Sequence, residues 1–326
     1  MSEPNEQRST PREILVATDL SAHSDRAVDR AIVLAQHWNA RLVAVHALEP
    51  VAHSVVSQSV QSPPSWRRLE NRAQAVEWEL RADLKKDGLA ASVLIEEGDP
   101  AEVILRAAEA TKADLVIAGM GRNELPARAL SGSTLDAIVR DASAPLLVVK
   151  KRVRGAYANV VVATDFSDAS RDALQTAVTL FDGCNLALFH AFHAPYASFS
   201  ESERANDAWA EIARDECDRF LARTPLPDDV RHRLAIVIEH GSPGPLLADY
   251  CRVTAADVVM LGAPRRGAVA RAFVGSRAEE LLRHVPCDVM AVPERRGASD
   301  RQQAENQSTS SRLARAADRV LSSTSQ

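Results

Sequence analysis

The chain has 326 residues with a formal net charge of -5, and 46% of the residues are hydrophobic. This length exceeds the roughly 100 to 200 residues expected of one domain, so two domains with separate cores are the first expectation. A slightly acidic chain has no general electrostatic attraction to nucleic acid or to an anionic membrane surface. Neither is therefore expected as a partner.

Residues 1–10 are polar, and no run of about 18 apolar residues occurs in the sequence. We therefore expect neither a signal peptide nor a membrane span, and a cytoplasmic location. The cysteines are Cys184, Cys217, Cys251 and Cys287. They are widely spaced and form no CxxC pair, so we predict buried, reduced thiols rather than a zinc site or a disulfide framework.

Short apolar runs alternate with helical patterns in the first half, which is typical of a parallel sheet covered by helices. The runs predict strands at residues 13–18, 40–48, 91–98, 113–119 and 145–150. Helical spacing of Leu69, Ala73, Val76, Leu80 and Leu84 predicts one long helix. Further helices are expected at Pro100, near Ser133, and after the first strand, where Asp19, Ser21 or Ser24 is the expected N-cap.

The second half repeats the first. The offset is 146 positions between Thr18 and Thr164 (164 minus 18) and 143 between Gly119 and Gly262 (262 minus 119), so about three residues are lost across the unit. Strands are predicted at residues 159–164, 185–191, 234–241, 256–262 and 288–293, and helices at residues 170–181, at 200–223, from Pro245 and from Ser276. Each copy should be a complete domain.

These patterns divide the chain into five segments. We predict a disordered N-terminus at residues 1–10, a first domain at 11–151, a linker at 152–156, a second domain at 157–294 and a polar, disordered tail at 295–326. The charge run "KKRVRGAY" around the linker is interpreted as solvated surface, with a specific anion site as the alternative. A transient helix in the tail that docks a partner also stays open.

A glycine-bearing loop follows the fourth strand of each copy and ends in Gly-Ser at a helix start. Ligands of open parallel sheets bind outside the carboxyl ends of the strands, where glycines and a helix N-terminus favour phosphate. The alternative is structural: Gly119 and Gly262 only end strands, and Ser133 and Ser276 only cap helices.

Several residues that recur in both copies resemble the universal stress protein family. Both first strands end in Ala-Thr-Asp-(Leu/Phe)-Ser, both second strands in His-Ala, and an Ala-Asp pair precedes both fourth strands. The resemblance covers roughly residues 11–293. It implies an α/β fold of two tandem doubly wound domains, each a five-stranded parallel sheet flanked by helices (adenine nucleotide alpha-hydrolase-like), packed as an internal pseudo-dimer.

ATP-binding members of the family have a loop of the form G-x2-G-x9-G-(S/T). By position, its first glycine corresponds to Gly119 and Gly262, and its third to Gly132 and Gly275, with the hydroxyls of Ser133, Thr134 and Ser276 behind them. The middle position holds Arg122 and Arg265 instead, although Gly121 offers a bulged alternative in the first copy. These arginines could bind phosphate as bidentate donors or could fill the groove that phosphate needs.

The resemblance also implies roles for four residues at strand ends. Asp19 and Asp165, each preceded by threonine (Thr18 in the first copy), correspond to positions near the ribose, with a helix N-cap as the alternative role. Ala47 and Ala191 correspond to the backbone position that meets adenine. The histidines before them, His46 and His190, are interpreted as structural rather than proton-transferring residues.

Catalytic motifs are missing from the sequence, because it has no GxxxxGK[ST] loop, GxSxG elbow, HExxH pair or Cys/His cluster. The resemblance therefore implies a non-enzymatic stress-response protein that binds ATP, with Mg only where it accompanies ATP, and that signals through unidentified protein partners. A nucleotide-free scaffold with degenerate pockets is the first alternative, and a weak ATPase or phosphotransferase is a minor one. Further pairing into a homodimer stays open.

Overall fold

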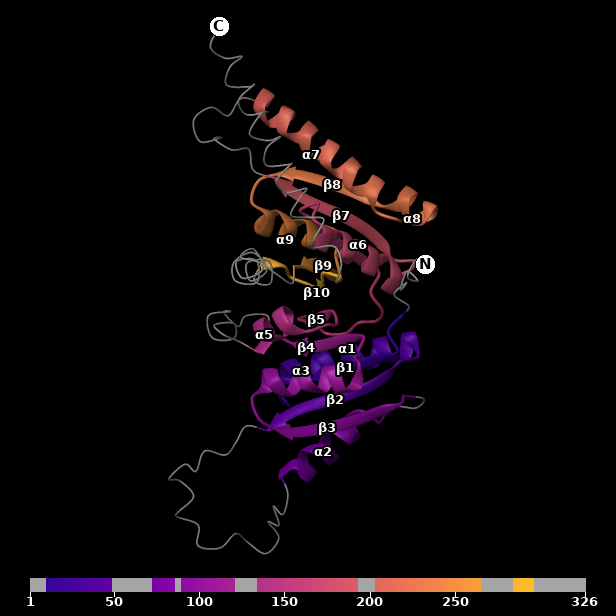
Figure 1. Cartoon of the computed structure of the whole chain (residues 1–326), viewed down its shortest axis with the longest axis vertical. Coiled ribbons are helices and arrows are strands. Elements are labelled where there is room, and N and C mark those ends of the chain that lie inside the picture. Colours follow the sequence, from indigo (N-terminus) through magenta and orange to yellow (C-terminus); the bar gives the residue numbers. More distant parts are fainter. Residues whose placement is uncertain are drawn as a thin grey trace, which may run out of the picture. The chain divides into compact units, whose positions relative to one another are not determined.

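The computed structural model describes residues 10–48, 72–85, 89–120, 134–192, 203–264 and 284–295. Its strands and helices all belong to one unit that ends at Pro293 (Figure 1). Among the described residues, none of the helices combines the length and apolarity needed to cross a bilayer.

Each copy contributes five parallel strands. The first copy has β1 (Glu13–Ala17), β2 (Arg41–Leu48), β3 (Ala91–Glu97), β4 (Leu115–Gly119) and β5 (Leu146–Val149). The second has β6 (Asn159–Ala163), β7 (Asn185–Phe192), β8 (Ala235–His240), β9 (Val258–Ala263) and β10 (Asp288–Pro293). Except in the edge strands β3 and β8, their β-branched and aliphatic runs are mostly buried between helices on both faces, as parallel strands usually are.

The two copies form one sheet. Its order is β3-β2-β1-β4-β5-β10-β9-β6-β7-β8, and the labelled strands follow this order from bottom to top in Figure 1. The central pair, β5 and β10, is antiparallel, with Leu147 opposite Met290. The predicted fold class is confirmed, and the pairing of the copies is an edge-to-edge continuation of their sheets.

Helices cover both faces of this sheet. The first copy has α1 (Ala22–Trp38), α2 (Arg72–Asp83), α3 (Pro100–Thr111) and α5 (Thr134–Asp141). The second has α6 (Asp168–Leu180), α7 (Glu203–Arg223), α8 (Asp228–Arg233) and α9 (Pro243–Val253). One apolar layer contains side chains from α1, α6 and α7, and the other contains side chains from α3, α5 and α9. Each layer includes residues of both copies, so the cores are continuous across the chain.

The predicted strands are confirmed within a few residues at their ends, and so are the helices that fall on described residues. The helix expected from Ser276 lies outside the described residues. Ser21, one of three candidates, is the N-cap of α1, and Ser167 is the N-cap of α6. The alternative role of Asp19 and Asp165 as N-caps is therefore wrong. The six-residue α8 was not predicted.

The junction between the copies contains a buried group of charged and polar side chains, the junction cluster, which consists of Arg30, Lys150, Lys151, Tyr157 and Asp288. Asp288 Oδ1 accepts the backbone N–H groups of Lys150 (2.8 Å) and Lys151 (2.9 Å). Its Oδ2 accepts the Tyr157 hydroxyl (2.6 Å) and lies 3.7 Å from Arg30 Nε. The Arg30 guanidinium also lies 4.0 Å from the centre of the Tyr157 ring.

This cluster corrects the interpretation of "KKRVRGAY" as solvated surface. Lys150 is only 4% exposed and Tyr157 only 6%, whereas Arg152 and Arg154 are exposed as predicted. Burial and the nearby Asp288 carboxylate raise the pKa of Tyr157 well above its usual value, and the Arg30 charge opposes them only partly. Tyr157 therefore stays a neutral donor to Asp288.

The Ala-Asp pair before each fourth strand has a structural role. Asp114 Oδ2 accepts the backbone N–H groups of Arg12 (2.8 Å) and Glu13 (3.1 Å), which open β1. Asp257 Oδ2 does the same for Ala158 (2.8 Å) and Asn159 at the start of β6. Each carboxylate thus joins the start of a central strand to the start of its neighbour.

Replacing Asp114 or Asp257 with alanine is expected to lower the free energy of unfolding by about 1 kcal/mol in either copy. Each change removes two hydrogen bonds to a charged acceptor, but at a site partly open to water. Urea denaturation followed by circular dichroism measures the effect. The asparagine variants are the matched control, since they retain an acceptor oxygen, and an alanine effect no larger than theirs would contradict a role for these two hydrogen bonds.

Candidate functional site

The candidate site lies where the strand order reverses. In the first copy, β1 is flanked by β2 on one side and β4 on the other, so the chain changes direction across the sheet between β1 and β4. In the second copy, β6 lies in the same way between β7 and β9. Ligands of doubly wound sheets bind outside the carboxyl ends of the strands at this point.

The residues after β1 form a network of hydroxyl and carboxylate groups around Ser24 of α1. Thr18 Oγ1 donates to Ser24 Oγ (3.1 Å), and Ser24 Oγ donates to Asp19 Oδ1 (2.5 Å). Asp19 Oδ1 also accepts the backbone N–H of Ser21 (2.9 Å). Thr18 and Ser24 are buried, whereas Asp19 is exposed. The network therefore fixes one carboxylate at the surface, directly beyond the end of β1.

These bonds also set the charge of Asp19. Partial burial raises its pKa, but the hydrogen bonds from Ser21 and Ser24 outweigh burial and leave the pKa below the usual value. Asp19 is thus a stable anion at neutral pH. An exposed carboxylate of this kind is suited to accept hydrogen bonds from the hydroxyls of a ligand.

The second copy repeats part of the network. Thr164 Oγ1 and Ser170 Oγ are 2.8 Å apart, and Asp165 Oδ1 accepts the backbone N–H of Ser167 (3.1 Å). The repeat offset relates Ser24 to Ser170, so a signal for this serine was present in the sequence. Both serines were considered only in connection with helix starts, and their contact with the strand-end threonine was missed.

The residue after each aspartate has a left-handed backbone conformation. Leu20 has φ 62° and Phe166 has φ 63°. Residues other than glycine rarely adopt this backbone conformation. Leu20 packs against the apolar cluster of Leu48, Val76 and Leu80, and the Phe166 ring lies 4.2 Å from the His190 ring. Packing therefore holds these residues in a strained conformation directly after the strand-end carboxylate.

The paired histidines have the same contact in both copies. His46 Nδ1 lies 2.8 Å from the Thr18 carbonyl oxygen, and His190 Nδ1 lies 2.8 Å from that of Thr164. A carbonyl only accepts, so Nδ1 carries the hydrogen in both rings. This bond supports the structural interpretation, because it ties the end of the second strand to the end of the first. Ala47 and Ala191 follow the histidines and are half-buried.

Gly119 and Gly262 are required by packing. A Cβ atom at Gly119 would lie 2.4 Å from the His23 carbonyl oxygen, and one at Gly262 would lie 2.3 Å from the Ala169 carbonyl carbon. The first turns of α1 and α6 therefore rest directly on the ends of β4 and β9. This close approach gives the two glycines a structural role beyond ending their strands. That role applies whether or not a nucleotide binds.

Most of the remaining predicted site residues lie outside the part of the chain that the structure describes. Thr134 begins α5 and is half-buried. The others lie outside the described residues: Gly121, Arg122, Gly132, Ser133, Arg265, Gly275 and Ser276. The structure thus describes the residues of the candidate site that lie at the strand ends, whereas the loop residues of the site stay a prediction.

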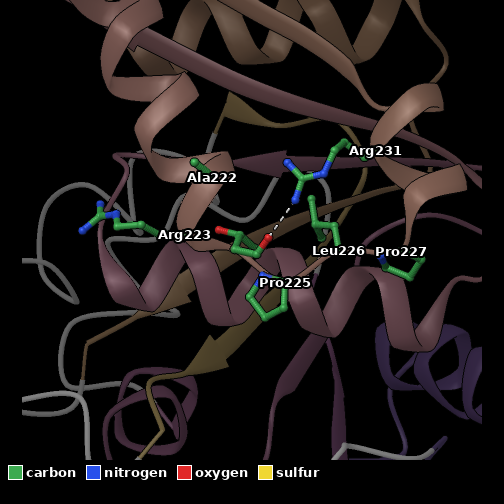
Figure 2. A pocket seen from close by; sticks show the side chains of 7 residues that line it. Ala222, Arg223, Pro225, Leu226, Pro227 and Arg231 are labelled. Atoms are coloured by element: carbon green, nitrogen blue, oxygen red, sulfur yellow. Dashed lines mark hydrogen bonds between the residues drawn. The ribbon is translucent and has the colours of Figure 1, made fainter.

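A surface pocket of about 560 Å³ lies elsewhere, at the end of α7 (Figure 2). It is lined by Ala222, Arg223, Thr224, Pro225, Leu226, Pro227 and Arg231. The guanidinium of Arg231, which is labelled in Figure 2, donates to the Thr224 carbonyl (3.1 Å) and to the Leu221 carbonyl. Arg231 thus stabilises the last turn of α7, and the pocket precedes the amino end of β8 rather than following a carboxyl end.

Comparison with known proteins gives one family for both copies. The sequence profile of the Universal stress protein family matches residues 11–150 and 156–293. A universal stress protein of Thermus aquaticus is 36% identical over 139 residues, which are 42% of this chain and 97% of the relative. One from Methanocaldococcus jannaschii is 31% identical over 146 residues, 43% of this chain and 82% of the relative.

Comparison of the fold with solved structures gives the same family. The crystal structure of a universal stress protein from Archaeoglobus fulgidus superposes with a TM-score of 0.58. It covers 88% of this chain and 97% of its own length, at 19% sequence identity. At this identity the likeness concerns the fold, and here it extends over both copies.

Proposed function

This chain belongs to the universal stress protein family, and we propose that it is a non-enzymatic stress-response protein that binds ATP in at least one copy and signals through protein partners. The observation that carries the proposal is the pair of strand-end networks at the two reversal points of the sheet. Each holds a carboxylate, Asp19 or Asp165, at the surface beyond the central strand.

The described residues fit the sugar end of a nucleotide. Asp19 is anionic and exposed, and its orientation is fixed by Ser21 and Ser24, so it is suited to accept a ribose hydroxyl. Phosphates would fall to the loop that includes Arg122 and Gly132, where Mg would accompany them. The first copy is the better candidate, because Gly121 and the "GST" sequence at residues 132–134 supply extra backbone and hydroxyl donors.

A nucleotide-free scaffold remains the second candidate, on two observations. Arg122 and Arg265 replace the middle glycine of the loop motif in both copies. In addition, Gly119 and Gly262 are explained by the approach of α1 and α6, so these glycines are no evidence for phosphate. In that case the paired copies would act as a binding surface for proteins.

The Asp19→Asn variant is expected to bind ATP at least about tenfold more weakly than the wild type, because a hydrogen bond to a charged acceptor is worth about 1.5 kcal/mol or more. Titration calorimetry with Mg-ATP measures this loss. Asparagine can still accept the Ser21 N–H, so the local fold should persist. The Asp165→Asn variant is the matched control, and it reports on the second copy alone.

Arginine-to-glycine variants then separate the two candidate functions. If the wild type binds ATP and Arg122→Gly weakens binding, the arginine is a phosphate ligand. ATP binding that appears only in Arg122→Gly or Arg265→Gly would show that the arginines close the pockets, and it would favour the scaffold. A wild type that neither retains ATP after purification nor binds it in titration would contradict the proposal.

A further inference from the structure

Two cysteines that are distant in the sequence lie together in the second copy. Cys251 is in the last turn of α9, and Cys287 immediately precedes β10. Both belong to the same apolar layer, with exposures of 1% and 0%. Their backbones meet at the start of β9, where the Ala256 N–H donates to the Cys251 carbonyl (3.0 Å) and the N–H of Asp288, next to Cys287, donates to the Asp257 carbonyl (3.1 Å). Both are free thiols. They form a buried thiol pair that the sequence, without a CxxC motif, did not reveal.

Two lysines at the end of the first copy lie beside this pair. Lys151 Nζ donates to the Ala256 carbonyl (2.7 Å), and the Ala256 N–H donates in turn to the Cys251 carbonyl (3.0 Å). Lys150 Nζ donates to the carbonyl of Val285, two residues before Cys287. Ammonium groups are thus anchored next to both cysteines.

The surroundings divide the two thiols by role. The hydrogen bond from Cys287 lowers the pKa of Cys251, and Lys151, Arg252 and Lys150 lower it further against the effect of burial. The same hydrogen bond raises the pKa of Cys287, and burial adds to the increase. These surroundings favour the thiolate at Cys251 rather than at Cys287.

The other two cysteines lack this environment. Burial and the nearby Asp218 raise the pKa of Cys217 to about 11. Burial and the neighbouring Asp257 also raise the pKa of Cys184, whose thiol donates to the Tyr157 carbonyl. Among the four thiols, only that of Cys251 has a lowered pKa, although Cys184 is the most exposed of them.

We propose that Cys251 and Cys287 are an oxidation site that a peroxide converts to an intramolecular disulfide. The Cys251 thiolate attacks one peroxide oxygen, the O–O bond breaks, and the departing oxygen takes a proton and leaves as water or an alcohol. Cys251 is then a sulfenic acid. The sulfur of Cys287 attacks it, the S–S bond forms, the S–O bond breaks, and the Cys287 proton leaves with the hydroxyl as water.

Access to the pair comes from the end of α9. Cys251 is two residues from the last residue of the helix, Val253, which is 86% exposed. Helix ends open locally at small cost, so fraying of this turn exposes the pair to a small oxidant while the sheet stays intact. Because fraying of one turn makes only a small opening, a bulky thiol reagent should react with the pair more slowly than hydrogen peroxide does.

The test is oxidation of the folded full-length chain with hydrogen peroxide. We expect the number of titratable thiols to fall by about two and the intact mass to fall by about 2 Da, as in disulfide formation. Tryptic mapping without reduction should give one cross-linked peptide that joins Cys251 to Cys287. Circular dichroism during the reaction confirms that the chain stays folded.

Two variants sharpen the result. In Cys287→Ser the sulfenic acid on Cys251 has no partner thiol, so dimedone should label Cys251. In Cys184→Ser the cross-link should form as in the wild type, at a rate within about twofold. A folded chain that forms no Cys251–Cys287 cross-link, that cross-links through Cys184 or Cys217, or that forms the pair only after unfolding would overturn the proposal.

Discussion

The Gly119→Ala variant is expected to lower the free energy of unfolding by about 3 kcal/mol, as overpacking against a rigid neighbour does. The new Cβ would lie 2.4 Å from the His23 carbonyl oxygen and 2.9 Å from Ser24 Cα. Both atoms belong to the backbone of α1, so a side-chain rotation cannot relieve the contact. The helix itself must move away from β4.

This displacement should also reach the candidate site. Ser24 is the residue whose hydroxyl joins Thr18 to Asp19, and it lies in the turn that has to move. We therefore expect Gly119→Ala to weaken ATP binding by the first copy as well as to destabilise the chain. Urea denaturation gives the stability, and calorimetry on the folded fraction gives the affinity.

Matched glycines make the measurement specific. Gly262 has the equivalent contact with α6, so Gly262→Ala should cost about as much. Gly183 has φ 79° but nothing near its Cβ position, so Gly183→Ala should cost only about 1 kcal/mol, from backbone strain. If Gly119→Ala unfolded at the same urea concentration as Gly183→Ala, the contact with α1 would not be what requires glycine.

The sequence was sufficient to predict the fold because its signals are local or periodic. The strands are apolar runs, the helices have apolar stripes, and the repeat offset fixes the two copies independently of any single motif. Thr18, Asp19 and Gly119 could be placed at the carboxyl ends of strands for the same reason, since such an end is visible as the end of an apolar run, whereas their roles toward a nucleotide came from the family resemblance.

The missed features depend on contacts between distant parts of the chain. Lys150 and Tyr157 belong to a charge run that is normally solvated, and their burial depends on Asp288, which is more than 130 positions away. The close approach of His23 to Gly119 and the Cys251–Cys287 pair are likewise tertiary. None of them has a periodic signal, so single-residue patterns could not reveal them.

The largest single loss of stability is expected from Asp288→Ala, at about 4 kcal/mol. The carboxylate of Asp288 is 0% exposed and accepts hydrogen bonds from Lys150, Lys151 and Tyr157. Its removal takes the acceptor from two buried donors and from the part-buried N–H of Lys151. It also leaves the Arg30 guanidinium buried without its counter-charge 3.7 Å away, which is the most costly part of breaking a buried ion pair.

Two further variants distinguish the buried charge from a general effect of mutation. Asp182→Ala is the control, because its side chain is 88% exposed in a surface ion pair with Arg233 and should change stability by less than about 1 kcal/mol. In a double-mutant cycle, Arg30→Met should cost clearly less in the Asp288→Ala background than in the wild type, since the stranded charge is then removed.

The position of the junction cluster explains why the effect should reach both copies. Arg30 lies on α1 of the first copy, Asp288 opens β10 of the second, and β10 pairs with β5 at the centre of the sheet. Loss of Asp288 should therefore destabilise the edge along which the copies pair, so protease cleavage within residues 150–157 should accelerate together with unfolding. Cleavage there at the wild-type rate, or additive costs in the cycle, would mean that the β5–β10 pairing and the shared apolar layers hold the copies together without this cluster.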